Sequence, residues 1–562
     1  MVNMACKIIA LCLLTIPLPG FTHAGKAAMI SDLETIRHGF SVEYAPTDWK
    51  YQFSGWELDN AINTIKEQIA LNPFLSVRDY QCLVKKFFRS THDYHVVPFF
   101  YSTEESRLPF TVKGAGDRFF IIDIDSDKLS PNQFPINIGD ELISFGGCPA
   151  FPVIRDLQFD EFGTDCCGTD RSLTEIFLTK REASRGHLVP NGPLEITVRS
   201  VNNDKISTFE LQWDYVPERI VSNFGDFEEE QCSLNKRLLQ KKLKVHFLNK
   251  KAGGPFSLAA WKSFTPILGD VIWEVEPWST FHAYIFIDSF DRKIGYIRIS
   301  SYDGDNYDAR DFASLIDRMQ EQTDALVIDQ VDNPGGSVFY MYALASMLSD
   351  KPLMTPRHHY KLTQADVAEA VEAIPQLESL ENDEDAVGLL GDSVGGYPVN
   401  FQLIKCVLGY YRFMLNQWSA GKTFTEPFHL SGVDKINVNS RHRYTKPILL
   451  LVNELDFSGA DFLPAILQDN KRVLILGTKT AGAGGLVIQN RYPSLFGIQG
   501  YTYTASIAER PNGDPIENLG VTPDIIYHLT PDDIQFGFSG YSAAIHGALN
   551  RFFECQEDGF ER

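Results

Sequence analysis

The stretch that decides the fold reads ILLLVNELDFSGADFLPAILQ, residues 448–468. Its first five residues, Ile448–Val452, are apolar without alternation, which is typical of a strand covered on both faces of a sheet. A helix is expected from about Gly459 to Gln468, so the chain turns from strand to helix at Ser458. A covered strand followed directly by a helix predicts an α/β layer.

The segments around this stretch repeat the alternation of strand and helix. Apolar residues at helical spacing, from Phe312 to Met319, separate two of the expected strands. We predict one large α/β core over residues 286–540, in which residues 355–440 form an insertion or lid. Further core strands are expected at residues 295–299, 325–328 and 473–476.

The first 24 residues have the composition of a secretory signal peptide. Lys7 supplies a positive charge, residues 8–14 are apolar, and Thr22-His23-Ala24 offers a cleavage site. The apolar run is too short, and too interrupted by proline, to span a bilayer. We expect an exported protein, secreted or periplasmic, without a stable membrane anchor. A buried N-terminal helix is the alternative.

Two parts of different character precede the core. Residues 25–104 are expected to be helical, with apolar residues near a period of 3.6 in Trp56–Asn72. Residues 105–215 contain short strand-like runs broken by glycine and proline. Within them, IGDELISFGG (residues 138–147) resembles the hairpin of PDZ-like modules, and an ordinary β hairpin is the alternative.

The remaining segments give weaker signals. Residues 216–285 contain an acidic run at 226–230 and a basic run at 236–251. Such runs are commonly a solvated helix face or a linker, and a protease-accessible inhibitory segment is the alternative. Residues 541–562 are expected to be a C-terminal tail.

Composition excludes some classes of function. The chain has 562 residues, 44% of them hydrophobic, and a net charge of −22, so it is globular and a poor partner for nucleic acid. No H-E-x-x-H motif occurs, and metal-dependent hydrolysis through His92, His95, His358 and His359 is a weak alternative. We predict no metal and no cofactor.

Two segments could supply a nucleophile and an oxyanion site. A hydroxyl at Ser458 would lie at the positive end of a helix dipole, which suits a nucleophile, although an N-cap serine is common there. The sequence NPGG, Asn333–Gly336, follows a buried strand and could expose backbone N–H groups. A plain turn is the alternative.

Two further segments could supply the proton-transfer groups. His95 lies in THDYHV, residues 91–96, and a histidine can act as a general base near neutral pH. Glu517 lies in PIENLGVTPD, residues 515–524, and could orient an imidazole. A lone histidine is usually structural, so neither residue is decisive by itself.

Taken in order, these segments resemble the tail-specific, or C-terminal processing, peptidase family of serine proteases. The resemblance covers residues 85–530 and includes the PDZ-like module and the NPGG turn. It also includes the serine, GTKTAG (477–482) and GVTPD (520–524). It implies a crotonase-like protease core that carries an inserted PDZ-like β domain and a helical N-terminal part.

One departure from the family pattern is informative. Members with a Ser-Lys dyad carry the lysine where this chain has Ala483, and an alanine cannot accept a proton. The family's other branch uses serine, histidine and glutamate. The resemblance to this branch implies a catalytic Ser458, His95 and Glu517, with the N–H groups of Gly459 and Gly335 as the oxyanion hole.

Length, export signal and the Thr480–Gly485 stretch are most similar to a chlamydial member of this branch. That resemblance implies a self-processing serine endopeptidase that forms a homodimer, acts on host or extracytoplasmic proteins and is delivered into a host cell. The alternatives are a periplasmic C-terminal processing peptidase and a catalytically inactive family member that binds proteins.

Overall fold

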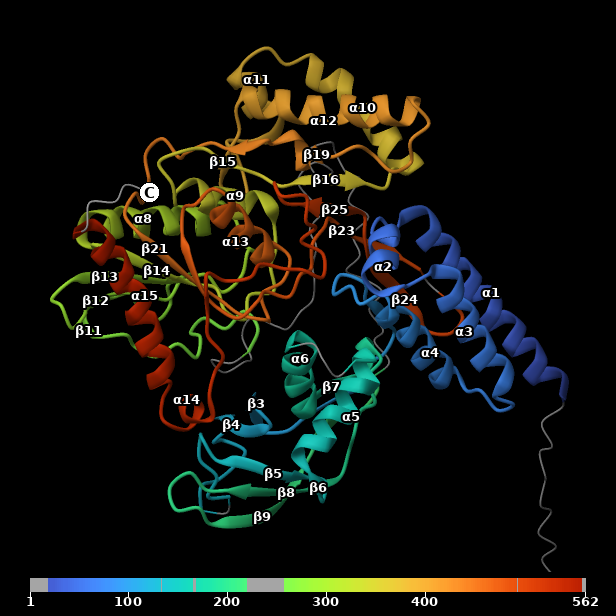
Figure 1. The fold of residues 1–562 in the computed structure, drawn as a ribbon. Helices are drawn as coiled ribbons and strands as arrows, with labels where there is room; N and C mark the ends of the chain where they lie inside the picture. The colour runs from blue at the N-terminus through green and yellow to red at the C-terminus, as the bar shows by residue number, and fades with distance from the viewer. Residues whose placement is uncertain (1–18, 133, 165–167, 220–256, 493, 558–562) are drawn as a thin grey trace, which may run out of the picture.

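The computed structural model describes residues 19–132, 134–164, 168–219, 257–492 and 494–557. Helices gather at the N-terminus, a small β-rich part follows, and a large α/β core completes the chain (Figure 1). Most of the predicted signal peptide, residues 1–18, lies outside the described residues. Helix α1 (Pro19–Glu43) begins before the predicted cleavage point at Ala24.

The core is built on a seven-stranded sheet in the order β11-β12-β13-β14-β21-β22-β26. The strands from β13 to β26 run parallel, and every residue of β14 and β21 is buried. The predicted α/β layer is therefore present. The strands are β11 (Asp270–Glu274), β12 (Ala283–Ile287), β13 (Lys293–Arg298), β14 (Ala325–Asp329), β21 (Ile448–Val452), β22 (Leu474–Gly477) and β26 (Ile525–Ile526).

Helices cover both faces of this sheet because alternate strand residues point to opposite sides. Leu450 packs in one cluster with residues of α8 (Asn306–Gln322), α9 (Val338–Ser346) and α13 (Gly459–Asp469). Leu449 and Leu451 pack in another cluster with Tyr541 and Ile545 of α15 (Ser539–Glu557).

Two predicted boundaries differ from the structure. Residues 541–557 are not a tail, because α15 buries its apolar side chains against the sheet. Residues 270–285 are not a linker, because they form β11 and the start of β12. Residues 220–256, the middle of the predicted linker or inhibitory segment 216–285, lie outside the described residues.

The insertion forms a helical layer over the core (Figure 1). It contains α10 (Gln364–Glu378), α11 (Asp383–Leu390) and α12 (Phe401–Ser419). Ala370, Leu403 and Tyr411 belong to the same hydrophobic cluster as the core helices. This packing makes the insertion an integral layer of the core.

The β-rich part contains a six-stranded sheet. Five of its strands lie in the order β3-β4-β5-β8-β9, and a short sixth strand pairs with β5. Helices α5 (Ala150–Phe162) and α6 (Gly168–Thr179) lie beside it (Figure 1). The predicted hairpin supplies β5. The five ordered strands are β3 (Phe110–Ala115), β4 (Arg118–Ile124), β5 (Glu141–Phe145), β8 (Pro193–Arg199) and β9 (Ile206–Gln212).

The N-terminal helices dock on the core through strand pairing and aromatic packing. They are α1, α2 (Thr47–Ser54), α3 (Leu58–Leu71) and α4 (Val77–Ser90). After α4, β1 (Pro98–Phe100) pairs antiparallel with β24 (Ile498–Thr504). The ring of Phe40 contacts those of Phe87, Phe88 and Tyr501 at centroid distances of 5.1–5.8 Å.

This docking predicts the effect of one substitution. Phe40→Ala should lower the midpoint of thermal unfolding by roughly 5 °C or more, because removing a buried phenylalanine typically costs about 3–5 kcal/mol. Phe74→Ala is the control, since Phe74 is 79% exposed, and its midpoint should stay near that of the wild type. Equal midpoints for the two variants, measured by circular dichroism, would contradict the packing described.

Candidate active site

Ser458 lies on a strained turn between β21 and α13. Its backbone has φ 55° and ψ −115°, a left-handed conformation that a non-glycine residue rarely adopts. An ordinary N-cap serine has β-region angles instead. Strain of this kind persists only where surrounding contacts enforce it, and such residues cluster at functional sites. The backbone therefore favours the nucleophile over the simple cap.

Asp461 is one of the contacts that enforce this turn. Its carboxylate is buried and accepts hydrogen bonds from the N–H of Ser458 at 2.9 Å and the hydroxyl of Thr480 at 2.5 Å. It also accepts from the N–H groups of Gly482 and Ala483 at 2.8 and 2.9 Å. Burial raises the pKa of Asp461 to about 6. One carboxylate thus holds the GTKTAG loop against the nucleophile turn.

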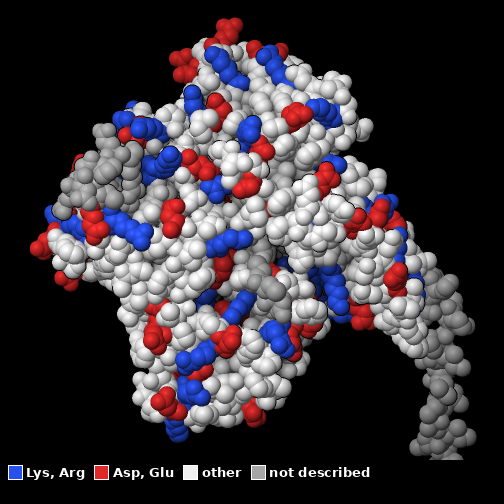
Figure 2. Space-filling model, viewed as in Figure 1, with Lys and Arg blue, Asp and Glu red and all other residues white. Residues whose placement is uncertain are grey.

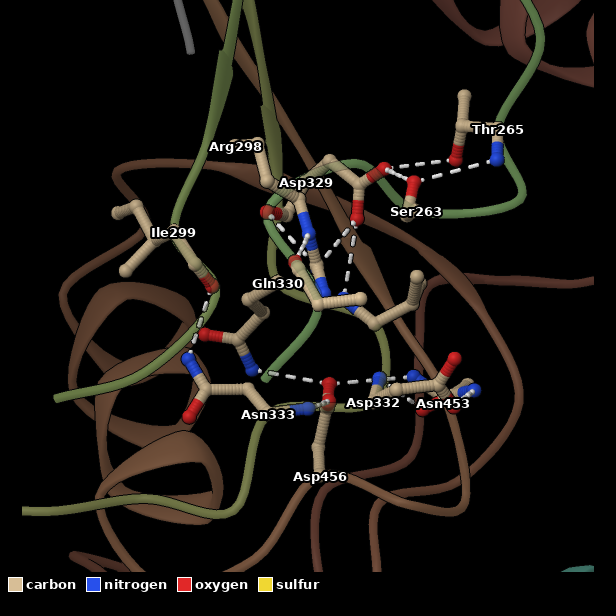
Figure 3. Close-up of polar contacts among 12 residues, drawn as sticks. Ser263, Thr265, Arg298, Ile299, Asp329, Gln330, Asp332, Asn333, Asn453 and Asp456 are labelled. Carbon is tan, nitrogen blue, oxygen red and sulfur yellow. Dashed lines mark hydrogen bonds and ion pairs between the residues drawn. The ribbon is translucent and has the colours of Figure 1, made fainter. Parts of the chain in front are cut away.

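Asp456 holds the NPGG turn in the same way (Figure 3). Its carboxylate accepts from the N–H groups of Asn333 and Asn453 at 3.1 Å and from the side-chain amide of Gln330 at 3.0 Å. The N–H of Phe457 donates to the carbonyl oxygen of Asn333 at 2.9 Å. These bonds fix the two glycines of the turn beside Ser458.

One of the two predicted oxyanion donors is hydrogen-bonded within the protein. The N–H of Gly335 is occupied, because it donates to Oδ1 of Asn333 at 2.8 Å. Gly336 is the better donor: a Cβ placed on Gly459 would lie 3.4 Å from the Gly336 nitrogen. Within the described residues, neither Gly336 nor Gly459 donates its N–H to a protein acceptor. Gly335 has a steric role instead, since a Cβ there would lie 2.8 Å from Cβ of Ser458.

His95 lies in a segment that contacts the Ser458 turn. It is 5% exposed, and the ring of the preceding Tyr94 packs against Phe457 at a centroid distance of 5.5 Å. Neither ring nitrogen has a hydrogen-bond partner in the described structure. Burial lowers the pKa of His95, an effect that Asp93 opposes and Lys50 reinforces. Burial thus favours the neutral imidazole, and both ring nitrogens are without a hydrogen bond.

Glu517 does not hydrogen-bond to this imidazole, so a direct Glu517–His95 contact is absent. One carboxylate oxygen accepts from Nζ of Lys50 at 2.5 Å and the other from the N–H of Gly484 at 3.0 Å. Both side chains of the Lys50–Glu517 pair are 0% exposed. Burial, with Asp93 nearby, raises the pKa of Glu517, and the ammonium of Lys50 opposes this rise and favours the carboxylate.

Lys50 links Glu517 to the histidine segment. Its ammonium also donates to Oδ1 of Asn518 at 2.7 Å and to the carbonyl oxygen of His92 at 3.0 Å. All three donors of the ammonium are thereby used. His92 lies three residues before His95. The buried ammonium of Lys50 therefore joins the loop that carries His95 to the loop that carries Glu517.

The sequence reasoning missed three of these residues. Asp461 had a signal, because an acid three residues after a serine is the capping-box spacing. Asp93 had a weaker signal, because an aspartate often accepts the backbone N–H two residues later. Here its carboxylate accepts the N–H of His95 at 2.9 Å. Lys50 had none, since nothing in the polar helix TDWKYQFS marks its lysine as buried.

The structure also bears on the weaker alternatives. In the described residues, no group of three or more His, Cys, Asp or Glu side chains could hold a metal ion. His358 bonds to Ser506 at 3.0 Å and His359 to Glu509 at 3.3 Å, within the core. Among the described helices, none combines the length and hydrophobicity needed to cross a membrane.

The buried ion pair predicts a large effect on stability. Lys50→Met should destabilise the protein by about 3–5 kcal/mol, because the carboxylate of Glu517 is left buried without its cation. Lys50→Met/Glu517→Gln should recover part of this loss. Lys422→Met, in an exposed pair with Glu426, should cost less than about 1 kcal/mol. Urea unfolding of the four proteins measures the difference, and similar midpoints for both single variants would contradict the pairing.

Comparison with known proteins agrees with this architecture. The family model "Peptidase family S41" matches residues 293–527, and the model "PDZ domain" matches residues 104–220. The chain is 34% identical to an uncharacterised protein of Chlamydia muridarum, over 91% of this chain and 90% of that protein. It is also 34% identical to a Chlamydia trachomatis protein, over 93% and 92% of the two chains.

Two solved structures are similar to this chain over nearly its whole length. The crystal structure of mature CPAF is similar with a TM-score of 0.82 at 32% identity, covering 95% of this chain and 99% of that one. The structure of mature CPAF complexed with lactacystin has a TM-score of 0.83 at 33% identity, covering 94% and 99%. With its PDZ domain, its α/β core and a serine on a strained turn, the chain belongs to peptidase family S41, the tail-specific serine proteases.

Proposed function

We propose that the chain is a serine endopeptidase in which Ser458 is the nucleophile and His95 the general base. Oγ of Ser458 attacks the carbonyl carbon of the scissile peptide bond, and His95 takes the hydroxyl proton. His95 then gives this proton to the leaving amine. The strained backbone of Ser458 beside two unused glycine N–H groups is the observation that carries the proposal.

The N–H groups of Gly336 and Gly459 stabilise the oxyanion of the tetrahedral intermediate. They belong to backbone that Asp456 and Asp461 already fix, so no reorganisation is needed as charge develops. A positioned donor of this kind contributes about 10²–10³ in rate.

Glu517 acts on the histidine through Lys50. The ammonium binds the carbonyl oxygen of His92 and so fixes the loop from which the imidazole projects. Asp93 supplies the negative charge that favours the imidazolium ion formed during the reaction. The third member of the Ser-His-Glu set is thus proposed as a positioning residue.

We further propose export, self-processing and homodimerisation. The charged and apolar pattern of residues 1–24 supports export, secreted or periplasmic. The contrast between the acidic run at 226–230 and the basic run at 236–251 supports a segment cut during self-processing. Host or extracytoplasmic proteins are the proposed substrates.

Two other functions remain open. The PDZ domain favours a C-terminal processing peptidase, because such modules can capture the tail of a substrate. A peptide blocked at its C-terminus should still be cleaved by an endopeptidase. An inactive binding protein is disfavoured by the arrangement of Ser458, His95 and the two glycines.

A fluorophosphonate probe tests the nucleophile. The wild type should be labelled, Ser458→Ala should not, and Ser431→Ala should behave like the wild type because Ser431 lies in a turn outside the site. Self-processing predicts fragments from the wild type that Ser458→Ala does not produce, as mapped by N-terminal sequencing. Equal labelling of Ser458→Ala would refute the assignment.

The pH dependence tests the base. Catalysis needs neutral His95, and burial lowers its pKa below the usual 6.5, so activity should fall only as pH drops below about 6.5. Lys50→Met removes a neighbouring positive charge that lowers the pKa of His95. In this variant the loss of activity on the acid side should therefore begin at a higher pH. The measurement is kcat/KM of a fluorogenic peptide from pH 4 to 9, where kcat/KM reports the free enzyme. If kcat/KM of the wild type fell with an apparent pKa above 6.5, His95 would not be the general base.

A further inference from the structure

A cavity of about 730 Å³ lies where the three parts of the chain meet. Its wall includes the end of α4, the His92–Tyr94 segment, β3, α6 and the loops after β21 and β22. Figure 2 shows charged side chains of both signs around the recess between the β-rich part and the core. The volume is in the range of ligand-binding pockets, so the cavity has room for a stretch of peptide.

This cavity adjoins both halves of the active site. Tyr94, in its wall, precedes His95 and packs against Phe457, which precedes Ser458. Ala481, also in the wall, donates its N–H to the carbonyl oxygen of Asp456 at 3.0 Å. A peptide bound here would lie against the segments that carry the nucleophile and the base.

The acidic groups of the wall already have partners. Glu454 accepts from Nζ of Lys113 at 3.0 Å and from the hydroxyl of Ser172 at 2.7 Å. Asp170 accepts from the hydroxyl of Tyr94 at 2.8 Å. Glu175 pairs with Arg171 at 3.3 Å.

Most cations of the wall have partners too. Lys113 is held by Glu454, Arg171 by Glu175, and Lys479 donates to the carbonyl oxygen of Asn518 at 3.3 Å. Arg89 differs: none of the described residues accepts a hydrogen bond from its guanidinium or lies within ion-pair distance of it. Glu161 and Asp170 act on Arg89 only from farther away.

Arg89 is nevertheless held in place. It lies in the last turn of α4, and its guanidinium carbon is 4.9 Å from the centroid of the Phe162 ring. Its Nε is buried without a partner. An arginine stays charged in a protein, and a guanidinium has five donors in a fork that matches a carboxylate. The guanidinium of Arg89 has no acceptor among the described residues, and a ligand that enters the cavity could supply the acceptor.

We propose that Arg89 is a carboxylate-binding residue of the substrate cavity, which binds either the C-terminal carboxylate of a peptide or an aspartate or glutamate side chain within it. The proposal rests on the proposed peptidase function, because it takes the ligand to be a peptide. It assigns Arg89 to substrate recognition, with no part in the chemical step. The bidentate geometry gives the selectivity: an amide in the same position cannot accept both N–H groups.

Direct binding tests the proposal without catalysis. The probes are three dye-labelled octapeptides of alanine, threonine and leucine. One has a free C-terminus, one has a C-terminal amide and a central glutamate, and one has a C-terminal amide and a central glutamine. Binding to full-length Ser458→Ala is measured by fluorescence anisotropy. At least one carboxylate peptide should bind roughly 10- to 100-fold more tightly than the glutamine peptide, as expected for hydrogen bonds to a charged group.

Substitution then assigns this preference to Arg89. In Ser458→Ala/Arg89→Met the preference should disappear, whereas Ser458→Ala/Lys86→Met should keep it, since Lys86 is an exposed cation on the same helix. Whichever carboxylate peptide shows the preference identifies the source of the carboxylate. Absence of any preference, or a preference that survives Arg89→Met, overturns the proposal. Fluorophosphonate labelling of the wild type decides the peptidase function separately.

Discussion

The active site depends on one buried ion pair, between Lys50 of the N-terminal helices and Glu517 of the core. Two charges removed from water are costly unless each is paired and fully hydrogen-bonded. The ammonium meets this condition through Glu517, Asn518 and the carbonyl oxygen of His92. The pair therefore exists only when the N-terminal helices are docked, and docking also brings Tyr94, next to His95, against Phe457, next to Ser458.

Two further carboxylates, Asp456 and Asp461, complete the arrangement from within the core. Asp456 accepts the N–H groups of Asn333, in the NPGG turn, and of Asn453. Asp461 accepts those of Gly482, in the GTKTAG loop, and of Ala483. Their role is to hold glycine-rich backbone that has few side chains of its own to pack. Ala483 fits this scheme, because its N–H serves Asp461 while its methyl group lies in a hydrophobic cluster with Phe457.

The sequence predicted those features that depend on local pattern. Continuous apolar runs identified β14 and β21, and the start of the following helix was correctly predicted just after Ser458. Helix α15 was misassigned because its burial depends on a sheet built from distant segments. Residues 270–285 were misassigned because β11 is an exposed edge strand, which has no buried apolar run to mark it. The N–H of Gly335 is a second case: it donates to the side-chain oxygen of Asn333, and no sequence pattern reports that bond.

The pairing of β1 with β24 has a consequence for biosynthesis. Pro98 lies opposite Tyr501, so the contact that seats the histidine segment closes a loop of about four hundred residues. Contacts of such long sequence separation form late in folding, because their closure entropy must be overcome first. A nascent chain cannot complete the pair until β24 has been synthesised. Chain connectivity therefore keeps the histidine segment from its seat on the core until most of the chain has been translated.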